Sequence, residues 1–436
     1  MKTANTTRDT LILGFAIFSM YFGAGNIIFP PYLGLISSSD WKISFVAYFL
    51  ADIGFATFAM FALLKVGGNV DNLTSKLGTI NGKILMAIII LCIGPLIALP
   101  RTGAVTYEML IVPYFGASTF NSLATSIIYF GLILFFTLRP TSMIEILGKV
   151  LSPLLFLSLI ILIIKGIFTP IGEISQNTTN DRLFFDGLLL GYQTLDILAA
   201  LAFGIIIIKI LKTKGYTNKK TNFKIVGYAS LIAAFAIMIV YFGLTYLGAT
   251  SSLVYETNIE KVTLLNNIIF QVFGSNGAII LAFVVFLACF TTGAALVSVT
   301  AEYFSKVSQG RFSYKNLVII TSFFAVTVTN FGLETIINFA APILFIVYPA
   351  AIILVILAFF DNYIDNLNIY KFSSFGAIIY SIFELLSNSY FKLSFMENIP
   401  LAKDGLGWIL PAIFFGIIGF LIKGTSKNRV KLQIIL

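Results

Sequence analysis

Residues 11–36 read LILGFAIFSMYFGAGNIIFPPYLGLI, and the segment Phe22-Gly23-Ala24-Gly25-Asn26 interrupts this apolar stretch in its middle. The stretch is long enough to cross a bilayer as a helix, which needs about 20 mainly apolar residues. A second such stretch, Leu183 to Lys209, is interrupted by Gly191-Tyr192-Gln193-Thr194-Leu195-Asp196. Backbone released from helical hydrogen bonds cannot face lipid, so it must be buried or bind something. Two interrupted helices in the two halves of a membrane protein indicate a binding site near the bilayer midplane.

The composition is that of an integral membrane protein. Of 436 residues, 58% are hydrophobic and only 11% are charged, whereas a soluble domain has about 25% charged residues. There is no histidine, which removes the commonest metal ligand and the usual proton carrier at neutral pH. No phosphate-binding Gly-x-x-x-x-Gly-Lys loop is present, and Cys92 and Cys289 are interpreted as packing residues rather than a disulfide. We expect a membrane protein that is not an enzyme and has no organic cofactor.

Apolar runs predict an all-α chain with about twelve transmembrane spans. The predicted spans are residues 10–36, 43–64, 84–111, 119–138, 143–168, 184–209, 223–249, 277–304, 315–332, 335–360, 372–390 and 406–423. Pro95 and Pro100 predict a tilt or kink in the third span. Between the seventh and eighth spans, residues 264–273 are apolar enough for a short helix, either an extracellular lid or a packed loop.

Lysine and arginine lie mostly on one side of these spans. With the N-terminus inside, 21 of the 28 basic residues fall on inner segments and six on outer segments, while Arg101 lies within a span. Cytoplasmic loops carry an excess of Lys and Arg, so this asymmetry predicts an even number of spans and two cytoplasmic termini. The same asymmetry explains the net charge of +9, and we predict no nucleic-acid partner.

The first interruption suits a carboxylate and a small cation. The segment Gly23-Ala24-Gly25 lets the backbone approach a ligand closely. Asn26 begins the outer half-helix, whose free N–H groups and positive dipole end would bind a carboxylate. Carbonyl groups of Ser19 and Phe22, freed at the end of the inner half, would face a small cation. Alternatively, Gly-x-Gly is only a close contact between two helices.

The second interruption combines polar side chains with one acid. Tyr192, Gln193 and Thr194 precede Asp196, which lies about 12 residues into its span, where an ionisable group is by default functional. Asp196 could bind an amine, hold a cation or cap a half-helix. The first two roles are functional and the third is structural.

The third and eighth spans carry further polar groups. Thr291 and Thr292 can present two hydroxyl oxygens, and Ala288 a carbonyl, which are ligands that sodium accepts. Alternatively, both threonines bond to the preceding helical turn. Arg101 and Glu108 share a helix face and could form a gate, a substrate contact or a charge pair. Glu302 and Lys306, four residues apart, are interpreted as an ordinary pair within one helix.

Four motifs together resemble the bacterial branched-chain amino acid:cation symporters, the BrnQ-type carriers, over the whole chain. They are the segment from Phe22 to Pro31, Pro100-Arg101-Thr102, the segment from Gly191 to Asp196 with Ala199 to Gly204, and Thr291-Thr292 with Ala301 to Phe304. The resemblance implies uptake of leucine, isoleucine and valine across the bacterial cytoplasmic membrane, driven by sodium or protons.

The family is related to the amino acid–polyamine–cation superfamily, which implies a five-plus-five inverted repeat with discontinuous first and sixth helices. The expected units are residues 1–171, residues 172–364, and two additional helices in residues 365–436. The resemblance also implies a sodium ion between the first and eighth helices, held by Ser19, Phe22, Ala288, Thr291 and Thr292. A second sodium in some members uses an asparagine at the position of Asn26 and a seventh-helix group, for which Thr245 is the candidate.

The resulting hypothesis is a sodium-coupled importer that works by alternating access. The substrate carboxylate would bind N–H groups around Gly23 to Asn26, and the amine would contact carbonyls and Asp196 or Gln193. The branched side chain would pack on Tyr192, Phe203 and part of the third helix.

Three rival functions remain open. A proton-coupled carrier would use Asp196 or Glu108 as its proton site. An ion channel would use the interrupted helices as its filter, although the two interruptions differ in sequence and do not resemble one. A sensor on this scaffold is the third, but no signalling domain is visible. The sequence does not indicate an oligomeric state.

Overall fold

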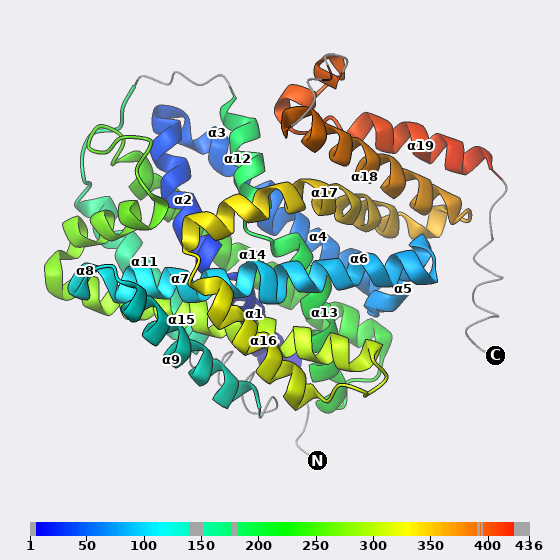
Figure 1. Cartoon of the computed structure of the whole chain (residues 1–436), viewed down its shortest axis with the longest axis horizontal. Helices are drawn as coiled ribbons and strands as arrows, with labels where there is room; N and C mark the ends of the chain where they lie inside the picture. The colour runs from blue at the N-terminus through cyan, green and yellow to red at the C-terminus, as the bar shows by residue number, and fades with distance from the viewer. Residues whose placement is uncertain (1–5, 139–150, 177–181, 390–392, 394–395, 423–436) are drawn as a thin grey trace.

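The computed structural model describes residues 6–138, 151–176, 182–389, 393 and 396–422, and these fold almost entirely into helices (Figure 1). The helices are α1 (Thr6–Tyr21), α2 (Ala24–Ser37), α3 (Trp41–Phe49), α4 (Phe55–Lys65), α5 (Val70–Thr74), α6 (Thr79–Leu91), α7 (Ala98–Leu110), α8 (Val112–Phe115), α9 (Thr119–Thr137), α11 (Ser152–Phe168), α12 (Leu183–Tyr192), α13 (Asp196–Thr213), α14 (Lys219–Ala249), α15 (Lys261–Val307), α16 (Tyr314–Thr329), α17 (Leu333–Phe359), α18 (Asn368–Ser389) and α19 (Ile409–Leu421).

Each of the twelve predicted spans coincides with helical structure. The first is divided between α1 and α2, and the sixth between α12 and α13. Eight helical stretches of the described chain are long and apolar enough to cross a membrane, and α11, α16 and α19 are shorter apolar helices. Residues 143–150 of the fifth predicted span lie outside the described residues. The all-α polytopic fold class is therefore confirmed.

Large apolar side chains cover the outside of the bundle. Phe120 and Phe135 on α9, Phe168 on α11 and Phe323 on α16 are largely exposed. Soluble monomers avoid exposing many large apolar side chains together, because water solvates apolar surface poorly. It is the surface that a lipid bilayer would cover.

Both predicted interruptions are present as breaks between consecutive helices. Phe22 and Gly23 separate α1 from α2, and residues 193–195 separate α12 from α13. Each discontinuous helix packs on a continuous one: α1 and α2 contact α14, while α12 and α13 contact α3 and α4. The breaks are therefore buried inside the bundle, where their free backbone groups are shielded from lipid.

Two further helices bend at π-helical turns. The segment Leu50–Gly54 joins α3 to α4, and the segment Cys92–Leu96 follows α6. In the second segment Gly94 has non-helical dihedral angles and Pro95 follows it, so the predicted kink of the third span is confirmed. Cys92 and Cys289 are buried free thiols, as expected.

Two further elements complete the fold, and the first is packed into the core through Leu264, Leu265 and Ile268. The first part of α15 is the predicted outer helix, which ends in a break at Gly274, where φ is 70°. The helices α18 and α19 pack side by side against α17 at one edge of the molecule (Figure 1). The two predicted additional spans are thus appended to the bundle rather than inserted into it.

Among the residues that the structure describes, six ion pairs join segments that the predicted topology places on the same side of the membrane. Four are inner pairs and two are outer pairs. The inner pairs are Asp9–Lys214, Lys76–Asp361, Lys209–Glu302 and Asp71–Lys306, and the outer pairs are Arg182–Asp404 and Lys261–Glu334. This agreement supports the alternation of the spans. It does not establish which side is cytoplasmic, so that orientation stays a prediction.

Candidate functional site

The first break is held by the side chain of Asn26. Gly23 has extended backbone angles and precedes α2, and its N–H group donates to Asn26 Oδ1 at 3.3 Å. Three residues of α2, beginning at Ala24, follow with N–H groups that have no partner within their own helix. A Cβ atom on Gly23 would lie 2.9 Å from Thr292, which explains why glycine stands where α1 meets α15.

The second break is a short turn that ends in a left-handed residue. Leu195 is buried with φ at 73°, an unusual conformation for a side chain of its size. Asp196 is the first residue of α13. In the described part of the chain its carboxylate is bound by Asn26 Nδ2 at 2.7 Å, not by a backbone group that would mark it as a cap. The two breaks are thus bonded directly to each other.

A chain of buried hydrogen bonds extends from this contact. Asn26 Nδ2 also donates to the hydroxyl of Tyr241 on α14 at 2.5 Å. Tyr241 in turn donates to Asp52 Oδ2 at 2.6 Å, and Thr194 Oγ1 donates to Asp52 Oδ1 at 2.8 Å. Asp52 lies in the π-helical segment between α3 and α4. Both breaks and both of the helices that support them therefore meet in one polar network.

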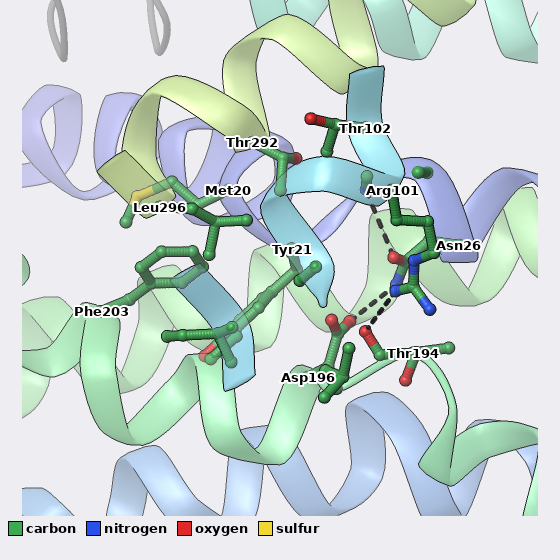
Figure 2. A pocket seen from close by; sticks show the side chains of 16 residues that line it. Met20, Tyr21, Asn26, Arg101, Thr102, Thr194, Asp196, Phe203, Thr292 and Leu296 are labelled. Atoms are coloured by element: carbon green, nitrogen blue, oxygen red, sulfur yellow. Dashed lines mark hydrogen bonds between the residues drawn. The ribbon is translucent and has the colours of Figure 1, made fainter. Parts of the chain in front are cut away.

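Arg101 anchors the second break from α7. Its guanidinium donates to the carbonyl oxygens of Gln193 at 2.6 Å and Thr194 at 3.1 Å, which lack helical partners. It lies over the Phe29 ring, and a Cβ atom on Gly25 would lie 2.8 Å from it. Figure 2 shows the guanidinium between the two breaks. This places a permanent positive charge beside the N-terminus of α2.

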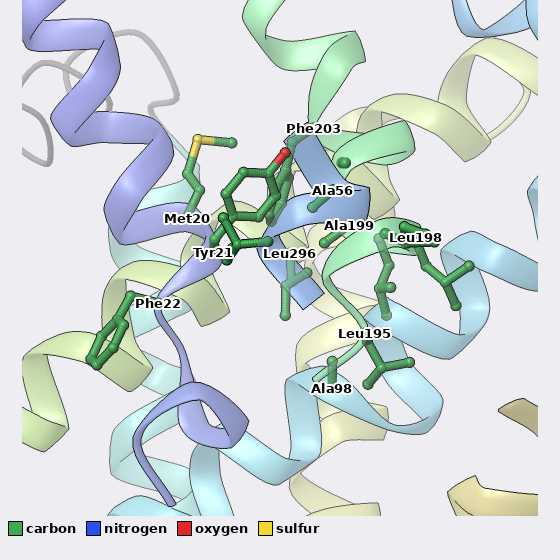
Figure 3. Packing of buried hydrophobic residues seen from close by; sticks show 14 of the residues in the cluster. Met20, Tyr21, Phe22, Ala56, Ala98, Leu195, Leu198, Ala199, Phe203 and Leu296 are labelled. Atoms are coloured by element: carbon green, nitrogen blue, oxygen red, sulfur yellow. The ribbon is translucent and has the colours of Figure 1, made fainter. Parts of the chain in front are cut away.

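The two breaks line a common cavity of about 20 Å³. This volume suffices for about one water molecule. Most of the predicted binding residues line it (Figure 2): Gly23, Ala24, Asn26, Arg101, Thr194, Asp196, Phe203 and Thr292. Its apolar side is formed by Met20, Tyr21, Ala199 and Leu296 beside Phe203, as Figure 3 shows. One side of the cavity is therefore charged and the other is apolar.

Three predicted substrate residues do not line this cavity. Gly25 contacts Arg101, and the Gln193 carbonyl is bound to the same side chain. The Tyr192 ring packs on Tyr348, with ring centroids 4.8 Å apart. Periodicity could not predict this, because the turn after Tyr192 sets the direction of its side chain.

The predicted cation residues converge where α1 meets α15. Thr292 Oγ1 donates to the carbonyl of Ser19 at 3.0 Å, and Thr291 Oγ1 lies 3.3 Å from the same oxygen. Thr291 also donates to Ala288 at 2.9 Å, which is the bond to the preceding turn considered above. Phe22 lies in the break itself, with its ring stacked on Phe18. Neutral hydroxyl and carbonyl oxygens together are a ligand set that suits sodium.

Sequence reasoning missed two members of the polar network. Asp52 carried a usable signal, since it is an ionisable residue inside the second predicted span. Tyr241 carried none, because tyrosines are common in this chain. The candidate seventh-helix group, Thr245, bonds to the carbonyl of Tyr241 instead. Tyr241 is thus the residue of α14 that reaches Asn26.

One expectation about charged residues is wrong, and one of the three alternatives for Arg101 and Glu108 is not seen. Glu302 and Lys306 do not pair with each other in the structure, because Glu302 bonds Lys209 and Lys306 bonds Asp71. Both bonds therefore join different helices. Arg101 contacts the carbonyls of the second break, and in the described residues no ion pair joins it to Glu108.

An all-helical membrane protein whose two discontinuous helices meet at a buried polar cavity has the construction of a secondary transporter. Solved transporters share this fold. The nucleobase-cation-symport-1 family transporter Mhp1, closed around bromovinylhydantoin, gives a TM-score of 0.63 at 15% identity, over 94% of this chain and 91% of its own. MhsT in complex with L-phenylalanine gives a TM-score of 0.56 at 16% identity, over 94% of this chain and 98% of its own.

The chain belongs to the branched-chain amino acid transport protein family, whose model matches residues 6–426. It is 34% identical to the branched-chain amino acid permease BraB of Bacillus subtilis, over 98% of this chain and 99% of that protein. It is 35% identical to the branched-chain amino acid transport system 2 carrier protein of Pseudomonas aeruginosa, over 97% of this chain and 98% of that protein. The resemblance predicted from the four motifs is confirmed, and the family consists of carriers rather than enzymes.

Proposed function

We propose that this protein imports leucine, isoleucine and valine together with sodium across the bacterial cytoplasmic membrane, with both termini in the cytoplasm. The names of the relatives supply the substrate class. The observation that carries the sodium assignment is the convergence of Thr291 and Thr292 on the carbonyl of Ser19, next to the cavity. A zwitterionic amino acid matches that cavity, which has a charged side and an apolar side.

The charged side orients the substrate backbone. The carboxylate lies at the N-terminus of α2 and beside Arg101, where free N–H groups and a guanidinium attract an anion. The ammonium group lies toward Asp196, the acid that begins α13. Charged groups on opposite sides of one cavity thereby fix both ends of the α-amino acid.

The apolar side selects the side chain. Burying a leucine side chain contributes about 1.5–3 kcal/mol, and one methylene changes this by about 0.8 kcal/mol. A pocket that includes Phe203, Met20 and Leu296 should therefore accept all three branched side chains with similar affinity. A charged side chain would lose its hydration there and is excluded.

Transport requires the cavity to open alternately to the two sides. At about 20 Å³ it is far too small for leucine, so the helices around it must separate to admit the substrate. Inward movement of sodium contributes about 2.3 kcal/mol per 100 mV of membrane potential, in addition to its concentration gradient. Rocking of one group of helices against the other would give alternating access.

The test is leucine uptake into proteoliposomes under an inward sodium gradient, compared with an inward proton gradient without sodium. We expect concentrative uptake with sodium, and its loss in Thr291→Ala and Asp196→Ala proteins that still fold. Uptake driven by protons alone would transfer the coupling role to an acidic residue. If neither gradient concentrates leucine, the substrate assignment is wrong.

A proton-coupled symporter is the second candidate. The observation that favours it is the burial of Asp196 within a hydrogen-bonded network at the site. Glu108, the other proposed proton carrier, does not line the cavity, and Asn266 donates to its backbone carbonyl at 3.4 Å.

A further inference from the structure

Asp52 is a buried acid that the proposed transport cycle leaves without a role. It is fully buried in the π-helical segment that joins α3 to α4. Both of its carboxylate oxygens are bonded, one to Tyr241 at 2.6 Å and the other to Thr194 at 2.8 Å. π-Helical turns are frequent at functional sites, and a buried acid within a membrane helix is costly unless it has a function.

Asp52 and Asp196 form a close pair of acids. Their carboxyl groups lie within side-chain hydrogen-bonding range of each other. They are also linked through Tyr241 and Asn26, since Asn26 donates both to Asp196 and to the Tyr241 hydroxyl. Two carboxylates this close cannot both remain charged in an apolar interior unless a positive charge joins them.

The side chains around the pair supply only part of that charge. The titratable groups that face it are Tyr21 on α1, Tyr48 on α3, Arg101 on α7, Tyr241 on α14 and Tyr348 on α17. Tyrosines are neutral at physiological pH, so Arg101 is the single cation of this group. Two carboxylates and one guanidinium leave a net charge of −1. A zwitterionic substrate adds no net charge, and the proposed sodium ion is held by Ser19, Thr291 and Thr292 rather than by the two acids. One further positive charge is therefore needed at the pair itself.

The geometry favours a proton as that charge. The bonds that connect Asp196, Asn26, Tyr241 and Asp52 are direct contacts of 2.5 to 2.7 Å, along which the two acids are linked by hydrogen bonds alone. The Tyr48 side chain is fully buried beside Tyr241, with ring centroids 5.2 Å apart.

We propose that Asp52 and Asp196 form one proton-binding site, in which a single proton is shared between the two carboxyl groups. This proposal deepens the proposed function and rests on it. When the substrate ammonium pairs with Asp196, the proton resides on Asp52, so that the two acids, Arg101 and the substrate together are electrically neutral. The proton comes from water on the open side and forms an O–H bond with the carboxylate. No other covalent bond changes.

The test is leucine affinity, measured by titration calorimetry on the purified protein at saturating sodium over a series of pH values. We expect the wild-type affinity to fall about tenfold per pH unit once the pair loses its proton. Asp52→Asn should keep the low-pH affinity throughout the series, because the amide is neutral and still accepts from Thr194. Glu108→Gln is the matched control and should retain the wild-type pH dependence.

A second variant keeps the proposal testable if Asp52→Asn does not fold. Tyr241→Phe removes a donor that stabilises the charged carboxylate, so the pH at which affinity falls should move upward. Calorimetry in two buffers of different ionisation enthalpy should also show one proton taken up per leucine at high pH.

Several outcomes would overturn the proposal. One is a wild-type affinity that does not change with pH, and another is an unaltered pH dependence in Asp52→Asn. If the titrations are repeated at several sodium concentrations and the pH at which affinity falls moves downward as sodium is raised, sodium competes with the proton. That result would assign the pair to a sodium ion instead. Absence of leucine binding at every pH would contradict the proposed function itself. This outcome differs from failure of the proton-site proposal alone, in which leucine still binds.

Discussion

At the scale of single residues, a substitution of Thr292 tests the proposed cation site. Its hydroxyl donates to Ser19 at 3.0 Å, and we expect Thr292→Ala to remove one of the converging oxygens. A neutral hydrogen bond contributes about 0.5–1.5 kcal/mol, so the sodium concentration for half-maximal uptake should rise roughly 2- to 12-fold. Ser298→Ala is the control, since that hydroxyl lies on the same helix but bonds Ala294. Unchanged sodium activation in Thr292→Ala would remove this residue from the site.

Substitutions of Arg101 test the hydrogen bonds by which α7 holds the second break. Arg101→Gln should leave the carbonyls of Gln193 and Thr194 without their charged donor, at a cost of about 1.5–3 kcal/mol for a bond to a charged group. We expect a lower melting temperature and leucine binding weakened at least about tenfold, which corresponds to 1.36 kcal/mol. Arg101→Lys should be intermediate, because an ammonium lacks the forked geometry. Wild-type melting and affinity in Arg101→Gln would contradict this assignment.

Position in the interruptions was a better guide to the residues that line the cavity than helical periodicity was to the direction of their side chains. Asn26, Asp196 and Phe203 were identifiable because they lie in or beside the interruptions, and all three line the cavity. Tyr192, the last residue of α12, packs on Tyr348 and does not line the cavity, and its direction depends on how α12 is packed. Tyr241 could not be found at all, because only the rotation of α14 brings it to Asn26.

At the scale of helices, hydropathy predicted the spans but not their irregularities. The π-helical turn at residues 50–54 has no proline to mark it, and its position is stabilised by the bonds that Asp52 makes to other helices. The kink near Pro95 was predictable because proline removes a hydrogen-bond donor. Bends with a local cause can be predicted from sequence, whereas bends with a tertiary cause cannot.

The contact between α2 and α14 depends on glycine at two positions. A Cβ atom on Gly248 would lie 1.9 Å from the Pro31 carbonyl oxygen, and one on Gly34 would lie 1.9 Å from that of Thr245. We expect Gly248→Ala to lower the melting temperature, because overpacking costs about 1–3 kcal/mol or more. Gly131→Ala on α9 is the matched control, since nothing lies within 4 Å of its Cβ position. Equal melting temperatures for the two variants would contradict this packing.

The second break stores backbone strain at Leu195. Its φ of 73° is unfavourable for any residue with a Cβ atom, by about 1–2 kcal/mol. Leu195→Ala and Leu195→Gly both lose the buried side chain, but only glycine relieves the strain. We therefore expect the glycine variant to be more stable than the alanine variant by about 1 kcal/mol in chemical denaturation. The reverse order would show that the turn is not strained.

At the scale of the whole molecule, the discontinuous helix of each half packs on a span of the other half. The first discontinuous helix packs on α14, the second span of the later half, while α12 and α13 pack on α3 and α4, the second span of the earlier half. This reciprocal packing supports the proposal that residues 1–171 and 172–364 are inverted repeats. Asp52 and Tyr241 belong to these two partner spans, and their side chains are hydrogen-bonded to each other.

The same architecture predicts how the closed cavity opens. The inner pair Lys209–Glu302 and the outer pair Lys261–Glu334 each join two helices at one end of the bundle. Partly exposed pairs contribute up to about 1 kcal/mol, which changes a conformational population at most roughly fivefold. We expect Glu302→Gln to favour opening on the inner side and Glu334→Gln to favour opening on the outer side.

An Ala199→Cys probe, at a residue that lines the cavity, makes this measurable. With a membrane-impermeant maleimide, Glu302→Gln should speed labelling only in inside-out vesicles, and Glu334→Gln only in right-side-out vesicles. Asp404→Asn is the control. It removes the pair between Asp404 and Arg182, which joins the start of α12 to the segment before α19. Because α19 packs outside the bundle core, this pair should not affect opening of the cavity. Faster labelling from the same side in both gate variants would contradict alternating access, since two ends that open together would form a channel rather than a carrier.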